Sequence, residues 1–95
     1  MKILKAQSLN PKKQIFRISD LTYITRMTPL KELLNGEDMI EPIEIMKHEQ
    51  SKNLRLGANG AIFTEKKYSV WKGSQRIQAA LQLGYTHIEG IIINE

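Results

Sequence analysis

The sequence contains no cysteine, and this absence excludes several kinds of chemistry at once. A chain without thiols cannot form disulfides, bind a metal through thiolates or use a cysteine as a nucleophile. The two histidines, His48 and His87, are far apart in the sequence and lack the spacing of a metal-binding pair. We therefore expect no metal site.

Long apolar runs are missing as well. No stretch approaches the roughly 20 apolar residues that a membrane-spanning helix needs. Residues 1–7 contain no apolar segment of the kind found in a secretory signal. Together with the lack of cysteine, these absences favour a cytoplasmic protein.

Acidic residues are unevenly distributed. The chain has 14 Lys and Arg against 10 Asp and Glu, a net charge of +4, and no acid occurs from residue 66 to residue 88. Basic residues cluster in and just before this acid-free stretch: Lys52, Arg55, Lys66, Lys67, Lys72 and Arg76. This mild positive charge permits binding of a nucleotide or a nucleic acid. A solvated surface is the simpler alternative.

The residues present fit one small α/β (α+β) domain over residues 1–95. Residues 1–13 form either a basic N-terminal arm or an edge strand begun by Ile3 and Leu4. Alternating and β-branched residues predict the main strands. These strands are expected at residues 14–18, 43–47, 67–71 and 87–93.

A first helix and a hairpin are predicted between these strands. Thr28 as N-cap and Pro29 at the first helical position predict a helix that ends at Asn35-Gly36. Residues 48–67 are expected to form a flexible hairpin or loop, with Asn59-Gly60 as its turn. Its arms would be residues 54–57 and 61–64. The expected fold is a small mixed sheet with two main helices.

The second helix follows Gly73. Gly73 can adopt backbone conformations that are closed to other residues, and Ser74 is a good N-cap. The predicted helix covers residues 74–83, and Gly84 follows it as the terminating glycine. Its apolar face is predicted from Ile77, Ala80, Leu81 and Gly84. If the strands before and after this helix share a sheet, a right-handed parallel connection is expected.

A strand–glycine–helix junction leaves backbone N–H groups free at the positive end of a helix dipole. Such a place suits an anion. Arg76 lies in the first helical turn and could add a positive charge to the same anion. A plain connection without any ligand is the alternative reading of this junction.

The order of these segments resembles a known family. Met39-Ile-Glu-Pro-Ile-Glu-Ile45, a polar gap, Tyr68-Ser-Val-Trp-Lys-Gly-Ser-Gln-Arg-Ile-Gln-Ala-Ala80, Leu83-Gly84 and an Ile-rich strand follow one another. This arrangement resembles the ParB/sulfiredoxin-like domain over roughly residues 14–93. The family's pattern contains an early Arg, a "PI" pair and "G-x-x-R-x-x-A-A".

The resemblance implies a phosphate-binding site and a ligand. In this family the pocket holds CTP in ParB proteins, or ATP in sulfiredoxins and in a free-serine kinase branch, so CTP or ATP with Mg²⁺ is the implied ligand. The expected phosphate-binding residues are Gly73, Ser74, Gln75, Arg76, Arg26 and Lys72. The expected pocket wall is Pro42, Ile43 and Tyr68. Lys66, Lys67 and Arg55 are the expected nucleic-acid contacts.

The departures from the family pattern matter as much as the matches. Ser74 occupies the place of the catalytic cysteine of sulfiredoxins, so reduction of a sulfinic acid is excluded. Partition proteins resemble "G-E-R-R-x-R-A" here, whereas this chain has Ser74, Gln75 and Gln78 in place of the acid and two arginines. Because a charge-assisted bond contributes about 1.5–3 kcal/mol, we expect weaker nucleotide binding, and hydrolysis is in doubt. The chain ends at Glu95 without a helix-turn-helix domain, so centromere reading is not expected.

Three functions remain open from the sequence. The first is a stand-alone ParB-like module that binds a nucleotide or nucleic-acid phosphate in the DNA metabolism of a phage, plasmid or mobile element. The second is an enzyme, a ParB-like nuclease, nucleotide hydrolase or phosphotransferase, which needs a carboxylate beside the phosphate. The third is a non-catalytic protein-binding inhibitor or adaptor on the same fold.

Overall fold

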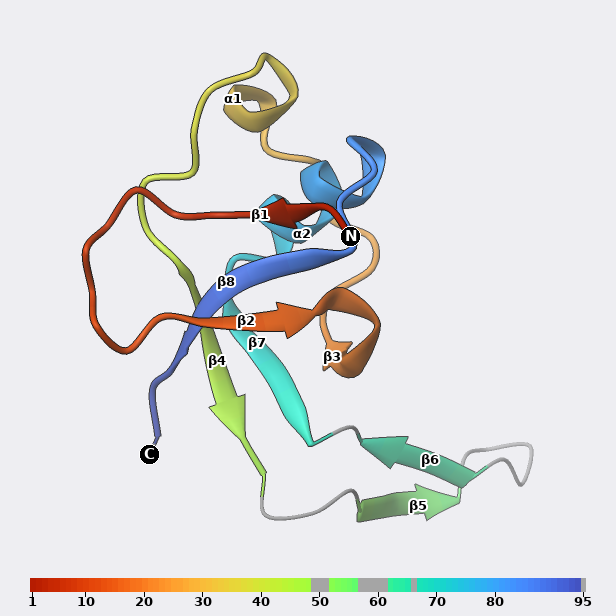
Figure 1. The fold of residues 1–95 in the computed structure, drawn as a ribbon. Coiled ribbons are helices and arrows are strands. Elements are labelled where there is room, and N and C mark those ends of the chain that lie inside the picture. The colour runs from red at the N-terminus through yellow and green to blue at the C-terminus, as the bar shows by residue number, and fades with distance from the viewer. Residues whose placement is uncertain (49–51, 57–61, 66, 95) are drawn as a thin grey trace.

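A mixed sheet and two helices form the body of the protein. The computed structural model describes residues 1–48, 52–56, 62–65 and 67–94. The main sheet has six strands, and a separate two-stranded hairpin extends away from it (Figure 1). The expected fold class, a small mixed sheet with two main helices, is confirmed.

The sheet is built around a central path of five strands. Its order is β1 (Ile3–Leu4), β8 (His87–Ile92), β4 (Ile43–Lys47), β7 (Tyr68–Lys72) and β3 (Leu21–Thr22), and β2 (Gln14–Arg17) pairs with β8 beside this path. Strand β8 runs parallel to β1 and β4 and antiparallel to β2. Strand β7 runs antiparallel to β4 and parallel to β3.

The sheet curls so that its two ends approach each other. Strand β2 passes through a single 3₁₀ turn (η1, Ile18–Asp20) directly into β3. Strand β2 pairs with β8, and β3 pairs with β7. This short turn therefore links the strand beside β8 to the strand beside β7, on opposite sides of β4. The rings of Phe16 and Tyr68 meet edge to face with centroids 5.3 Å apart, which fastens β2 to β7.

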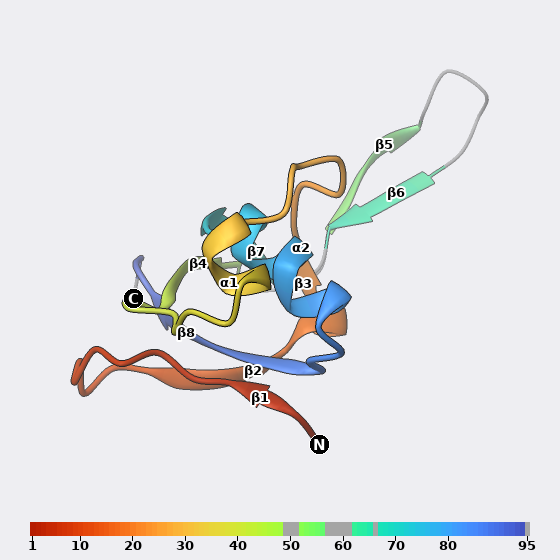
Figure 2. The same cartoon turned by 90° about the horizontal axis from the view of Figure 1, so that it is seen from above.

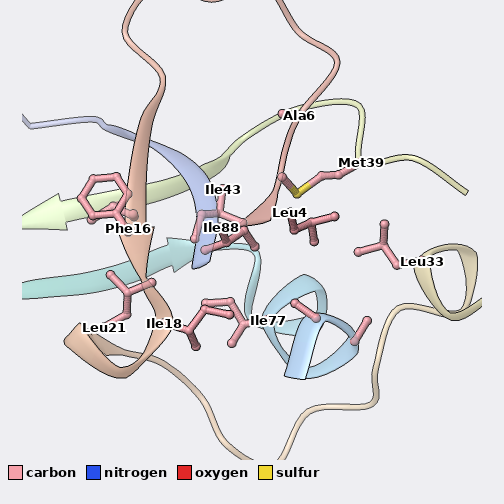
Figure 3. Packing of buried hydrophobic residues seen from close by; sticks show 13 residues of the cluster. Leu4, Ala6, Phe16, Ile18, Leu21, Leu33, Met39, Ile43, Ile77 and Ile88 are labelled. Carbon is pink, nitrogen blue, oxygen red and sulfur yellow. The ribbon is translucent and has the colours of Figure 1, made fainter. Parts of the chain in front are cut away.

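The core lies inside this curl and against the second helix, α2 (Ser74–Gln82) (Figure 3). Alternation along β4 buries Ile43 and Ile45, and Ile88 of β8 points to the same side. The largest fully buried side chains are Leu21, Ile43, Ile45, Ile77 and Ile88. Ile77 and Ala80 of α2 are buried as expected, whereas Leu81 is 42% exposed.

The expected parallel connection across α2 is wrong. Strands β7 and β8 belong to one sheet, but β4 lies between them. Since β4 is antiparallel to β7 and parallel to β8, β7 and β8 run in opposite directions. Strand β4, which comes earlier in the chain, therefore lies beside β7 in the place where a β–α–β unit would put β8.

The first helix, α1 (Lys31–Leu34), is shorter than expected. Its N-cap is Leu30, so Thr28 and Pro29 precede the helix. The backbone N–H of Leu30 donates to the carbonyl of Gln75, at 3.2 Å, which directs this segment onto α2. Figure 2 shows the two helices side by side, on the same side of β2 and β8. The helix ends at Asn35 and Gly36 as expected.

The remaining expected elements are largely confirmed. The hairpin has arms at β5 (Lys52–Leu56) and β6 (Ile62–Glu65), and the Asn59-Gly60 turn lies outside the described residues. Ile3 and Leu4 do form an end strand of the sheet. No helix within the described ranges is long and apolar enough to cross a membrane.

The junction between β7 and α2 depends on Gly73. Its φ is +123°, and a Cβ there would lie 2.5 Å from Ile43 Cγ2. Any side chain at this position would therefore meet both a strained backbone and a fully buried neighbour. Strand β4 and the start of α2 can be this close only because residue 73 is a glycine.

We expect Gly73→Ala to lower the free energy of unfolding by about 2–4 kcal/mol, because it adds a steric clash to backbone strain. Gly84→Ala is the matched control. Gly84 also has a positive φ, +84°, but a Cβ there would contact nothing within 4 Å. It should cost about 1 kcal/mol. Urea unfolding of both variants measures the difference, and equal losses would contradict the role given to Ile43.

Candidate functional site at the start of helix α2

Ser74 does not cap α2, contrary to the expectation from the sequence. The N-cap is Gly73, which has no side chain to donate or accept, and Ser74 is the first helical residue. The Ser74 side chain is buried, and its Oγ accepts a hydrogen bond from the Ile24 backbone N–H at 3.3 Å. The serine is thus used to hold a neighbouring loop.

The first turn of α2 presents two free backbone donors. The N–H groups of Arg76 and Ile77 both donate to the Gly73 carbonyl, at 2.9 and 3.1 Å. The N–H groups of Ser74 and Gln75 have no acceptor among the residues that the structure describes. Because α2 is nine residues long, these donors stand at the positive end of a substantial helix dipole.

A hollow of about 340 Å³ lies over this turn. Its floor is the segment 73–76, one wall comes from Ile24, Met27 and Leu30, and Trp71 and Lys72 complete it at the end of β7. Among the residues that the structure describes, no acidic side chain lines the hollow. Trp71 is 68% exposed, which leaves much of a large aromatic side chain open to solvent beside the free donors.

The loop that forms the wall of the hollow is fastened to α2 at three points. Ser74 Oγ accepts from the N–H of Ile24, and Gln78 Nε2 donates to the Ile24 carbonyl at 3.1 Å. The third bond is the one from the Leu30 N–H to the Gln75 carbonyl. Ser74 and Gln78 therefore shape the wall of the hollow.

Arg76 has a structural role in addition to its position beside the hollow. Its Nη1 donates to the carbonyls of Glu41 and Pro42, at 3.2 and 3.4 Å, and so ties α2 to the segment that enters β4. Arg76 also borders a second hollow of about 500 Å³, whose acidic residues are Glu32, Glu37, Asp38 and Glu41. Its positive charge therefore stands between the donor-rich hollow and an acidic one.

The other expected site residues do not line this hollow. Two of them lie behind the turn: Ile43 is buried and packs against Gly73, and the Pro42 carbonyl accepts from Arg76. Arg26 is exposed and does not line the hollow. Tyr68 begins β7, at the opposite end of the strand from the turn, and packs on Phe16.

The expected nucleic-acid contacts are also dispersed or undescribed. Lys67 lies over the ring of Tyr68, with its Nζ 5.7 Å from the centroid, rather than at the turn. Lys66 lies outside the described residues, and so does the Arg55 side chain. Of the basic residues expected at the phosphate site, Lys72 and Arg76 line the hollow.

Sequence reasoning missed Trp71 and Gln78. No local pattern marked Trp71, because β7 shows no alternation of burial: residues 68–70 are half-buried, and Trp71 and Lys72 are both exposed. The role of Gln78 carried no local signal either, because its partner is a backbone carbonyl in a loop 54 residues away.

Comparison of the chain with protein-family models, with curated proteins and with solved structures finds no match. The interpretation of the hollow therefore depends on its own residues and geometry.

We expect Ser74→Ala to loosen the loop without unfolding the protein. Loss of one hydrogen bond to a backbone N–H should cost about 1 kcal/mol and should speed exchange of the Ile24 amide proton by about tenfold if that bond protects it. Gln75→Ala is the control, since the Gln75 side chain is exposed and has no partner among the described residues. Amide exchange measured by NMR tests this. An unchanged exchange rate of the Ile24 amide proton would contradict the role of this hydrogen bond in holding the loop.

Proposed function

We propose that this protein is a ParB-like module that binds the phosphate of a nucleotide or nucleic acid in the hollow at the start of α2. The observation that carries the proposal is the pair of free backbone donors at Ser74 and Gln75, set beside Lys72 in a hollow that no acidic side chain of the described residues lines. Its setting would be the DNA metabolism of a phage, plasmid or mobile element.

The phosphate would be bound mainly by the backbone. Its oxygens would accept from the N–H groups of Ser74 and Gln75, in the favourable field of the helix dipole. Lys72 would add a flexible positive charge. Because Arg76 already donates to two carbonyls, its main contribution would be to hold the turn and to add charge at its edge.

Trp71 favours a phosphate that carries a base. A base stacked on an exposed aromatic ring gains about 1–3 kcal/mol, whatever the base. A bare phosphate would gain nothing from the ring. The ligands to test are therefore CTP and ATP, each with and without Mg²⁺, and a single-stranded oligonucleotide, with pyrophosphate as the form that lacks a base.

Binding without turnover suits the hollow better than catalysis. Phosphoryl transfer and phosphodiester cleavage need a carboxylate or metal beside the phosphate. Within the described part of the chain, no acid lines this hollow, and Glu41 lines the neighbouring hollow across Arg76. A nuclease or phosphotransferase would have to recruit its acid from that side.

Trp71 also provides the readout for the test. It is the only tryptophan in the chain, so its fluorescence reports on this one position. We expect CTP or ATP to change the fluorescence in a saturable way and to shift the amide resonances of Ser74 and Gln75. Lys72→Gln should weaken this binding about three- to tenfold, because an exposed charge pair contributes modestly.

Lys12→Gln is the matched control for Lys72→Gln, because it removes the same charge from an exposed position that does not line the hollow. It should leave the affinity within about twofold, as expected for a distant, solvent-screened charge. An equal loss in the two variants would indicate a nonspecific charge effect. No change in either signal at millimolar ligand would disprove the proposed function.

A further inference from the structure

A third hollow, distinct from the acidic hollow beside Arg76, lies at the opposite end of α2 from the candidate phosphate site. It has a volume of about 490 Å³ and is formed where η1, the last turns of α2 and the start of β8 come together. Its walls are mainly apolar and aromatic, from Ile18, Tyr23, Leu81 and Tyr85. A concave, largely apolar site with a few polar groups is the usual form of a small-molecule site.

Two basic side chains line this hollow beside the hydroxyl groups of Ser19 and Thr86. They are Arg17 and His87, and no acidic side chain among the described residues lines it. The two are direct partners across the β2–β8 pair, so their side chains leave the sheet on the same face. The Arg17 guanidinium has no acidic partner among the described residues. A positive charge is thus left available beside apolar walls.

His87 is held in one orientation by its neighbour. Thr86 Oγ1 lies 3.2 Å from the Lys2 carbonyl oxygen and 2.7 Å from His87 Nδ1, within hydrogen-bond distance of both. Nε2 is the ring nitrogen without a partner among the described residues.

The Tyr85 ring forms a fixed part of the wall. Lys2 Nζ lies 4.4 Å from the centroid of this ring and also donates to the Leu83 carbonyl at 2.7 Å. The Tyr85 backbone N–H donates to the Ala80 carbonyl at 2.9 Å, which closes the end of α2. The ring is therefore positioned by the chain itself before any ligand arrives, which lowers the ordering cost of binding.

From these observations we propose that this hollow binds a small molecule with a flat apolar body and one anionic group, such as an aromatic carboxylate. The apolar body packs between Tyr23, Tyr85 and Leu81, and the carboxylate pairs with Arg17, whose planar guanidinium matches the two oxygens. This site is separate from the phosphate site, so each can be tested without the other.

A matched pair of probes separates the charge from the ring. 2-Naphthoate and 2-naphthamide share the same aromatic body and differ in charge. In the wild-type protein we expect naphthoate to bind about fivefold more tightly than naphthamide. The amide resonances that shift should belong to residues 17–23 and 81–87. Titrations followed by NMR measure both quantities at once.

Two variants test the two halves of the proposal. Arg17→Gln should remove the preference for naphthoate and leave naphthamide binding within about twofold. Leu81→Gln should weaken both probes about equally, by three- to tenfold, because it removes apolar wall from an exposed helix position and keeps good helix propensity. Arg26→Gln is the charge-matched control, from an exposed arginine outside the hollow, and should change neither affinity.

The wild-type comparison decides the proposal even if a variant folds poorly. Equal affinity for the two probes, no saturable shift at millimolar probe, or shifts centred on the turn at Gly73 would each overturn it. An equal effect of Arg17→Gln and Arg26→Gln would also overturn it, because the preference would then reflect net charge and not this hollow.

Discussion

The close approach of Gly73 to Ile43 joins three elements at one point. Strand β7 ends there, α2 begins there, and β4 passes close enough that a Cβ on residue 73 would lie 2.5 Å from an Ile43 methyl group. Because Ile43 is also fully buried in the core, the position of the turn is fixed by the packing of the whole sheet. The free N–H groups of Ser74 and Gln75 are therefore held in fixed positions.

The loop before α1 forms one wall of the hollow that lies over this turn. The loop is attached to α2 through the side chains of Ser74 and Gln78 and through the Gln75 carbonyl. These neutral polar groups bond to backbone groups of the loop that lie about 50 residues away in the sequence. Ser74 and Gln78 hold Ile24 in place, and the Gln75 carbonyl holds Leu30. The side chains of Ile24 and Leu30 help to enclose the hollow.

The two ends of α2 carry hollows of different character. At its start the polar groups are backbone donors and Lys72, with an exposed tryptophan at the edge. At its end, apolar and aromatic side chains enclose a larger space beside Arg17 and His87. No acidic residue among those that the structure describes lines either hollow, although an acidic hollow adjoins the first one at Arg76. One short helix thus separates two places that suit anions of different shape.

Local patterns in the sequence determined most of the elements. The alternation in residues 43–47, the Ile-rich segment before Asn94 and the glycines that flank α2 predicted the strands, the second helix and both of its ends, because these signals act between close neighbours in the chain. Tertiary structure alone decided that β4 lies between β7 and β8, that Ser74 bonds to Ile24 instead of capping, and that Arg76 reaches the carbonyls before β4. Each of these depends on contacts between segments more than 20 residues apart, and no local periodicity records which distant backbone group a side chain will meet.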